Sequence, residues 1–217
     1  MSADRGAARI AGALFLLAMA ASLAGGALLE DAIAGPDHLA SLREARPRAA
    51  LGIGLELVNA LAVVGIAAAL YPVLRRRNEG AAIGYLGLRL LESFACVLAA
   101  LMPLALIALA RDAGAPGNAA GNVAQYAAPL LLALRAQGTA LLVPLFFSLG
   151  ALVFYSLALR ARLLPRFITV WGLVAVVLVL AVNLFQPGIA LSMLLALPII
   201  ANEIFLGVWL LAKGFED

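Results

Sequence analysis

Residues 81–110 read AAIGYLGLRLLESFACVLAALMPLALIALA, and this stretch decides the fold class. A transmembrane helix needs about 20 mainly apolar residues. This run exceeds that length, so we expect it to tilt or to extend beyond the bilayer. Only two of its side chains, Arg89 and Glu92, carry a charge. The stretch therefore predicts a membrane-spanning helix that holds two charges.

Five more apolar runs surround this one, at residues 9–29, 49–74, 129–159, 165–185 and 189–212. The chain is 65% hydrophobic and 12% charged, and a water-soluble domain carries about twice that charged fraction. We therefore predict an all-α bundle of six transmembrane helices, forming a single integral membrane domain over residues 1–217. Polar connections are expected at 31–48 and 111–126. We interpret 9–29 as a retained first helix, with a cleaved signal peptide as the alternative.

Basic residues predict the direction of these helices. Cytoplasmic loops of membrane proteins carry an excess of Lys and Arg. One predicted side carries nine basic residues: Arg5, Arg9, Arg75, Arg76, Arg77, Arg160, Arg162, Arg166 and Lys213. The other side carries four: Arg43, Arg46, Arg48 and Arg111. Both termini are therefore expected in the cytoplasm. Four aromatic residues fall near the same ends of the helices, where rings suit the membrane interface: Tyr71, Tyr155, Trp171 and Trp209.

The composition excludes several classes of site. The basic residues sit at the ends of apolar runs rather than along a soluble surface, so they do not indicate nucleic-acid binding. Cys96 is the only cysteine and His38 the only histidine, which excludes an intramolecular disulfide, a thiolate cluster and a His-rich metal site. Ser–His catalysis is likewise not supported. We predict no metal and no cofactor.

Small residues and prolines within the runs predict how the helices pack. Glycines at 25–26, 52/54 and 80/84/87 fit close approach between helices. Pro103, Pro144 and Pro198 each free a backbone carbonyl, and neighbouring helices can satisfy such groups.

Five ionisable residues lie within the predicted spans. A charge at the centre of a span costs roughly 2.5–3.5 kcal/mol on insertion scales, so such residues usually face the protein interior and pair. Glu56 and Arg135 fall at a similar level in the outer leaflet, and we expect them to pair. Arg89 and Glu92 lie about 13 and 18 Å from the inner surface, and Glu203 about 13 Å, at 1.5 Å per residue.

The inner set forms the main candidate site. Arg89 and Glu92 are three residues apart and share a helix face, and Asn202 adds a polar group beside Glu203. Arg89 is expected to bridge the two carboxylates. Two carboxylates and one guanidinium leave one negative charge, which a proton, a cation or a substrate amine would neutralise. Alternatively, the cluster only locks helices together, or one carboxyl is simply neutral.

Several segments resemble a known family. They are Arg9-Ile10-Ala11-Gly12, Leu70-Tyr71-Pro72-Val73-Leu74, Leu88-Arg89-Leu90-Leu91-Glu92, and Asn202-Glu203-Ile204 with Val208-Trp209-Leu210-Leu211-Ala212-Lys213-Gly214. These resemble the bacterial membrane family called domain of unknown function 4386, over nearly the whole chain. The resemblance implies a small multi-helix membrane protein, with no established activity to carry over. It marks Arg89, Glu92 and Glu203 as the family's characteristic polar set. A Gly commonly precedes the last Glu in that family, where Asn202 stands here.

These observations favour an integral protein of the bacterial inner membrane, without demonstrated enzymatic activity. It is expected to bind a lipid-like or small ligand, or a partner helix, at the inner cluster. A small proton- or ion-coupled transporter using Glu92 and Glu203 is the first alternative, and a membrane enzyme is the second. The bilayer is the expected partner, nucleic acid is not, and the oligomeric state stays open.

Overall fold

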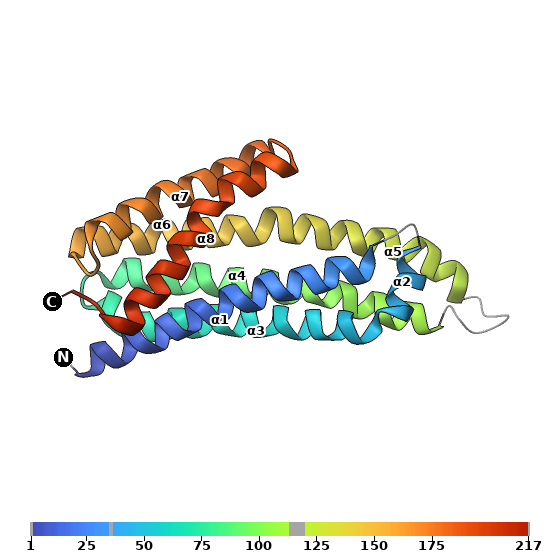
Figure 1. Ribbon diagram of the computed structural model, residues 1–217, viewed down its shortest axis with the longest axis horizontal. Coiled ribbons are helices and arrows are strands. Elements are labelled where there is room, and N and C mark those ends of the chain that lie inside the picture. The colour runs from blue at the N-terminus through green and yellow to red at the C-terminus, as the bar shows by residue number, and fades with distance from the viewer. Residues whose placement is uncertain (1, 35–36, 113–119, 217) are drawn as a thin grey trace.

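The computed structural model describes residues 2–34, 37–112 and 120–216. Figure 1 shows a bundle of helices named in chain order. Their bounds are α1 (Ser2–Ile33), α2 (His38–Glu44), α3 (Arg46–Arg75), α4 (Glu79–Asp112), α5 (Ala120–Gln137), the π-helical segment η1 (Gly138–Leu142), α6 (Val143–Ala161), α7 (Arg166–Phe185) and α8 (Ile189–Ala212).

Six helical stretches are long and apolar enough to cross a membrane. They are Asp4–Ile33, Arg46–Arg75, Glu79–Arg111, Tyr126–Ala161, Arg166–Phe185 and Ala190–Ala212. The described residues contain no strand. The prediction of an all-α protein with six transmembrane helices is confirmed. Several helices begin or end a few residues outside the predicted runs, because hydropathy marks only the apolar part of a helix. Charged residues such as Glu and Arg are good helix formers and extend the ends into water.

The polar connection predicted at 31–48 contains the short helix α2. Asp37 caps its N-terminus by accepting hydrogen bonds from the backbone amides of Leu39 and Ala40. Leu42 is buried and Leu39 packs beside it, and Nε of Arg43 donates a hydrogen bond to the carbonyl of Ala110 on α4, so these contacts hold the helix against the bundle. In the connection predicted at 111–126, α5 begins at Ala120. Residues 35–36 and 113–119 of these connections lie outside the described residues.

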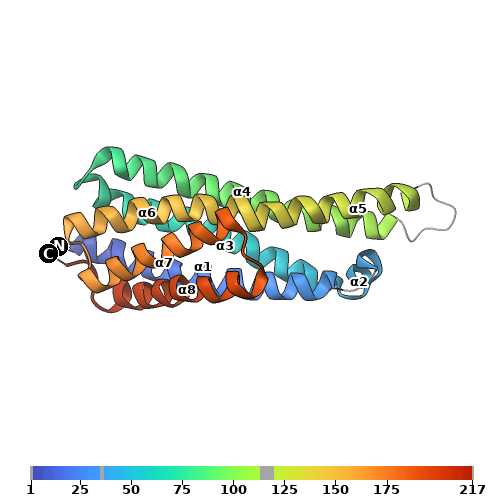
Figure 2. The same cartoon turned by 90° about the horizontal axis from the view of Figure 1, so that it is seen from above.

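The six long helices pack in a ring that follows the chain order. Helix α1 contacts α3, α3 contacts α4, α4 contacts α6, α6 contacts α7, α7 contacts α8, and α8 returns to α1. Both termini lie at the same end of the bundle in two perpendicular views (Figures 1 and 2). The hairpin formed by α7 and α8 diverges from the other helices away from that end (Figure 1). This arrangement places the inward faces of α4, α6 and α8 around one interior.

Glycines set two of the close helix contacts, as predicted for residues 25 and 52. A Cβ on Gly25 would lie 2.9 Å from the carbonyl oxygen of Gly52, where α1 meets α3. A Cβ on Gly12 would lie 2.6 Å from the carbonyl oxygen of Gly207, where α1 meets α8. The interpretation is wrong for Gly26, Gly54, Gly84 and Gly87, because nothing lies within 4 Å of a Cβ at any of these four positions.

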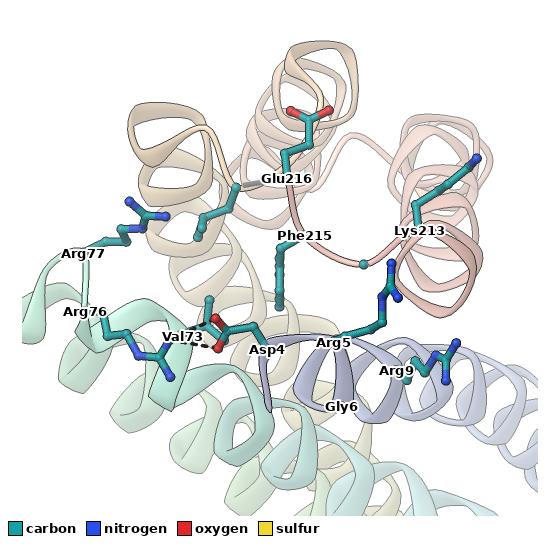
Figure 3. Close-up of a pocket in the computed structure, with 12 residues that line it drawn as sticks. Asp4, Arg5, Gly6, Arg9, Val73, Arg76, Arg77, Lys213, Phe215 and Glu216 are labelled. Atoms are coloured by element: carbon teal, nitrogen blue, oxygen red, sulfur yellow. Dashed lines mark hydrogen bonds and ion pairs between the residues drawn. The ribbon is translucent and has the colours of Figure 1, made fainter. Parts of the chain in front are cut away.

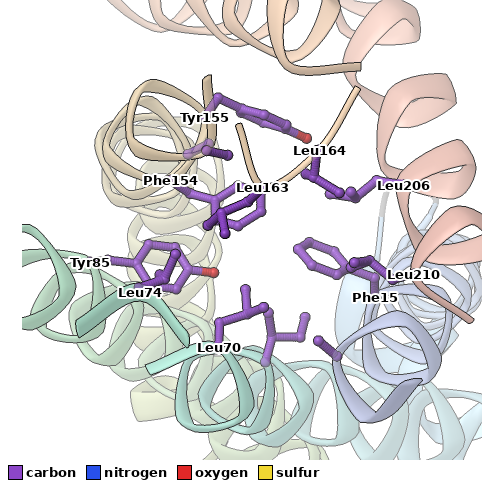
Figure 4. Close-up of a cluster of buried hydrophobic side chains, with 14 of the residues drawn as sticks. Phe15, Leu70, Leu74, Tyr85, Phe154, Tyr155, Leu163, Leu164, Leu206 and Leu210 are labelled. Carbon is purple, nitrogen blue, oxygen red and sulfur yellow. The ribbon is translucent and has the colours of Figure 1, made fainter. Parts of the chain in front are cut away.

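A hydrophobic core fills the ring near the end that holds the termini. Side chains from α1, α3, α4, α6 and α8 point toward one another there (Figure 4). Phe154 packs edge-on against Tyr155, with ring centroids 5.1 Å apart. Tyr155 is only 1% exposed, so its prediction as an interface residue is wrong: its side of α6 faces the interior of the ring. Tyr71, Trp171 and Trp209 are half-buried.

Candidate functional site

Arg89 and Glu92 form an ion pair on one face of α4. The Nη1 atom of Arg89 donates a hydrogen bond of 2.8 Å to Oε2 of Glu92. The two residues are 3% and 4% exposed. A spacing of three residues brings the side chains together on the same helix surface. The pair is therefore closed within α4 and needs no second helix to form.

Aromatic rings enclose the guanidinium of Arg89. The Tyr85 ring and the Phe147 ring have centroids 5.4 and 5.3 Å from Cζ of Arg89, within the range of cation–π attraction. The Nε atom of Arg89 also donates to the Tyr85 hydroxyl, at 3.3 Å. Gly150 on α6 lies beside this side chain, since a Cβ there would be in ordinary van der Waals contact with Nε, at 3.7 Å. Among the described residues, Nη2 of Arg89 has no hydrogen-bond partner.

Asn202 connects α8 to α6 and α7 through hydrogen bonds. The Tyr155 hydroxyl on α6 donates a 2.6 Å hydrogen bond to Oδ1 of Asn202 on α8. The Nδ2 atom of Asn202 donates to the carbonyl of Ile168 on α7, at 3.1 Å. Gly172 makes the approach of α7 possible, since a Cβ there would overlap the Tyr155 ring. Asn202 is fully buried, and both ends of its amide are satisfied.

Glu203 differs from its neighbours in the same layer. It keeps a partly exposed surface, whereas Arg89 and Glu92 are buried. Its carboxylate makes no hydrogen bond, and no ion pair within 4.0 Å, with any described residue. Glu203 lies one turn before Gly207, which packs on α1, so the two residues share one face of α8.

Of the inner set of predicted residues, the structure pairs Arg89 with Glu92, whereas Asn202 bonds to Tyr155 and Ile168. Glu203 has no ion-pair partner among the described residues, so the predicted bridge from Arg89 to both carboxylates does not form. Sequence reasoning missed the roles of Tyr85, Phe147 and Tyr155. The position of Tyr85, four residues before Arg89, was a signal that could have found it. Neither Phe147 nor Tyr155 carried such a signal. We call these seven residues the polar centre: Tyr85, Arg89, Glu92, Phe147, Tyr155, Asn202 and Glu203.

The structure also brings Glu56 and Arg135 together in the outer layer. Arg135 donates to both carboxylate oxygens of Glu56, at 3.0 Å from Nη1 and 2.6 Å from Nη2. Its Nη1 atom also donates to the carbonyl of Ala99, at 3.2 Å. Pro103 lies four residues after Ala99 and has no amide hydrogen to occupy that carbonyl. Arg135 therefore neutralises a carboxylate on α3 and satisfies a carbonyl that a proline frees on α4.

The carbonyls near a second proline also accept hydrogen bonds from a side chain of another helix. Pro144 follows the π-helical segment η1, and a proline ring crowds the carbonyl four residues before it, here Ala140. The Nδ2 atom of Asn183 on α7 donates to the carbonyls of Ala140 and Leu141, each at 3.0 Å. The expectation that neighbouring helices satisfy such carbonyls is confirmed at Pro103 and at Pro144.

Across 2–34, 37–112 and 120–216, no three His, Cys, Asp or Glu side chains are gathered closely enough to hold a metal ion. Cys96 is buried and accepts a weak hydrogen bond from Asn59, at 3.9 Å. The arrangement of the polar centre is suited to hydrogen bonding and charge pairing.

Comparison with known proteins agrees with this architecture. The model of the family described as "Domain of unknown function (DUF4386)" matches residues 10–214. The matched region contains every residue of the polar centre and of the outer pair. No curated protein and no solved structure matches the chain. Because the family model covers nearly the whole sequence, this six-helix membrane protein belongs to the domain of unknown function 4386 family.

Proposed function

We propose that this protein binds a lipid-like or small ligand at the polar centre, with Glu203 as the contact for a positively charged or hydrogen-bond-donating group. The observation that carries the proposal is the state of Glu203: a partly exposed residue in a spanning helix, whose carboxylate has no hydrogen-bond or ion-pair partner among the described residues. Uncompensated charges within a bilayer are costly and usually mark functional positions. A ligand amine or hydroxyl would supply the missing partner.

The rest of the centre supports recognition of a polar ligand group. Arg89 and Glu92 neutralise each other, so the carboxylate of Glu203 sets the net charge. The Nη2 atom of Arg89 adds a donor without a partner among the described residues. The half-buried Phe147 ring supplies apolar surface beside the Arg89 guanidinium, while the Tyr85 and Tyr155 rings are fully buried behind it. A ligand with an amine and an apolar tail matches this combination.

Labelling with dicyclohexylcarbodiimide tests the proposal. This apolar reagent modifies protonated carboxyl groups that it can reach from the lipid. In nanodiscs we expect an adduct on Glu203, found by peptide mass spectrometry, and none on the buried Glu92. Dodecylamine added first should suppress the adduct. The Glu203→Gln variant should lose it, and Glu79→Gln, on an exposed residue, should keep it. Labelling that dodecylamine leaves unchanged, or no labelling of Glu203, would refute the proposal.

Transport remains the second candidate function, because a ligand that reaches Glu203 from one leaflet could be released on the other side. Flux of dodecylamine into proteoliposomes separates the two functions. A binding protein without transport predicts the same flux for the native chain and for Glu203→Gln. A transporter predicts flux with the native chain that falls to the protein-free rate in the variant.

We also propose that the protein lies in the bacterial inner membrane with both termini in the cytoplasm. The nine basic residues assigned to the predicted inner side support this orientation. Single cysteines at Asn78 and Ala34, introduced in a Cys96→Ala chain, test it. In intact cells a membrane-impermeant maleimide should label Ala34→Cys and not Asn78→Cys, and the reverse pattern would contradict the orientation.

A further inference from the structure

A cavity of about 770 Å³ opens at the end of the bundle that holds both termini. Three parts of the chain line most of it: the first two turns of α1, the end of α3, and the segment that follows α8 (Figure 3). It lies apart from the polar centre and shares none of its residues. The outer pair does not contribute to it either.

The lining of this cavity is strongly basic. Five cationic side chains contribute: Arg5, Arg9, Arg76, Arg77 and Lys213. Two carboxylates, Asp4 and Glu216, also line it. Asp4 is already engaged, because both of its oxygens accept hydrogen bonds of 2.9 Å from Nη1 of Arg76. The other four cationic side chains make no ion pair within 4.0 Å with any described residue. The cavity therefore carries an excess of positive charge.

The backbone at the end of α8 builds one wall of the cavity. Gly214 has φ of +81°, a conformation that favours glycine, and there the chain turns out of α8. The amide of Glu216 then donates a 2.9 Å hydrogen bond to the carbonyl of Leu163. Phe215, between them, packs partly buried against the hydrophobic core. The tail is thus fixed across the end of the ring, and Lys213 is held on the same side as Arg5 and Arg9 (Figure 3).

The depth of the cavity corresponds to the headgroup region. Ile10 follows Arg9 directly and is 57% exposed, so an apolar surface begins next to the cavity. Trp209 lies one turn before Lys213 and packs against Phe205 and Phe167. Indole rings gather where the apolar core of a bilayer meets its headgroups. The cationic groups therefore lie where a phosphate attached to acyl chains would also lie.

We propose that this cavity binds a phosphate group, either in the headgroup of an anionic phospholipid or in a free phosphate-bearing solute. Guanidinium groups form paired hydrogen bonds with phosphate oxygens, and ammonium groups add point charges. Basic pockets at the ends of transmembrane helices are suited to anionic headgroups. Arg5, Arg9 and Lys213 would contact the phosphate directly, while Arg76 remains paired with Asp4.

Thermal unfolding in nanodiscs of defined composition tests the site. In phosphatidylcholine nanodiscs containing 30% phosphatidylglycerol we expect a higher melting temperature than in pure phosphatidylcholine. The double variant Arg9→Gln/Lys213→Gln should lose most of this increase. Arg166→Gln is the matched control, because Arg166 is an exposed cation at the start of α7 that does not line the cavity. Its increase should equal that of the native chain.

Inorganic phosphate added to phosphatidylcholine nanodiscs tests the second source. Stabilisation by phosphate that the double variant loses would identify a free solute as the ligand, and stabilisation by phosphatidylglycerol alone would identify a lipid. In either case the double variant should bind the phosphate-bearing ligand at least about tenfold more weakly than the native chain does, which is the loss of affinity expected for one charge-assisted hydrogen bond. The proposal is overturned if neither addition stabilises the protein, or if Arg166→Gln loses as much as the double variant. The second outcome would indicate diffuse surface charge rather than a site.

Discussion

Replacing Arg89 with methionine tests the energetics of the polar centre. The Arg89–Glu92 pair is buried, with side chains 3% and 6% exposed and a 2.8 Å hydrogen bond between them. Removing one partner of such a pair leaves a buried charge without compensation, which typically costs about 3–5 kcal/mol. The variant also loses the attraction of two rings for the guanidinium. We therefore expect the free energy of unfolding to fall by at least about 3 kcal/mol.

The assay is reversible unfolding in mixed detergent and dodecyl sulfate micelles, followed by the fluorescence of the two tryptophans. Arg76→Met is the matched control, because Arg76 pairs with Asp4 at an exposed position, with side chains 57% and 36% exposed. Exposed pairs contribute about 0–1 kcal/mol, so this variant should lose at most about 1 kcal/mol.

The double variant Arg89→Met/Glu92→Leu separates the stranded charge from lost packing. It removes both charges, and replacing a buried pair with apolar residues is often neutral or stabilising. We expect it to recover most of the stability that Arg89→Met loses. The reasoning fails if Arg89→Met costs no more than the control. It also fails if the double variant is as unstable as the single one, since the rings around Arg89 would then account for the loss.

Three further substitutions test the helix contacts by the same unfolding assay. Gly12→Ala places a Cβ 2.6 Å from a backbone oxygen of α8 and should lower the free energy of unfolding by about 1–3 kcal/mol. The control Gly26→Ala has open space around its Cβ and should not destabilise the protein. Equal losses of stability in the two variants would contradict the close contact at Gly12. Tyr155→Phe leaves the buried oxygen of Asn202 unpaired and should cost about 1–3 kcal/mol; an unchanged stability would show that the 2.6 Å bond contributes nothing. Asn183→Leu should lower the free energy of unfolding by about 0.6 kcal/mol, and at most by about 1.7 kcal/mol. The loss should be smaller in a Pro144→Ala background, because the backbone there can regain its own hydrogen bond. Equal losses in both backgrounds would show that Asn183 does not compensate for the proline.

Hydropathy and charge predicted the number, order and type of the long helices, because a bilayer imposes length and apolarity on every span. The short helix α2 was not predicted, because seven residues with one buried leucine show almost no helical periodicity of apolar residues. The π-helical segment could not be predicted from the sequence either. It depends on Pro144 and on a side chain from α7 that lies 39 residues away in the sequence.

Four residues of the polar centre were predicted from the sequence: Arg89, Glu92, Asn202 and Glu203. Its three aromatic rings were not predicted, and the expected contact between Arg89 and Glu203 does not form. Counting residues from the membrane surface gives the depth of a side chain, but not the direction in which it points around its helix axis. Arg89 and Glu92 share a helix, so their spacing determines both their relative depth and their relative direction around the helix axis. Glu203 lies on another helix, and its depth matched that of Arg89 without fixing a contact. Tyr155 has a depth that suits an interface, but the packing of α6 against α7 and the hydrogen bond to Asn202 on α8 hold it in the interior.

The unequal lengths of the helices have a consequence for the surrounding lipid. The apolar helix at Arg166–Phe185 has 20 residues, and the one at Glu79–Arg111 has 33, or about 30 and 50 Å of helix. Lipids beside α7 therefore meet a hydrophobic belt close to the normal bilayer thickness, while lipids beside α4 meet a longer one. Each ångström of mismatch costs a fraction of a kcal/mol, relieved by tilting or by local thickening of the bilayer. The protein should thus distort its membrane unevenly around its circumference, and the thickness of the host bilayer should influence how far the α7–α8 hairpin leans from the bundle.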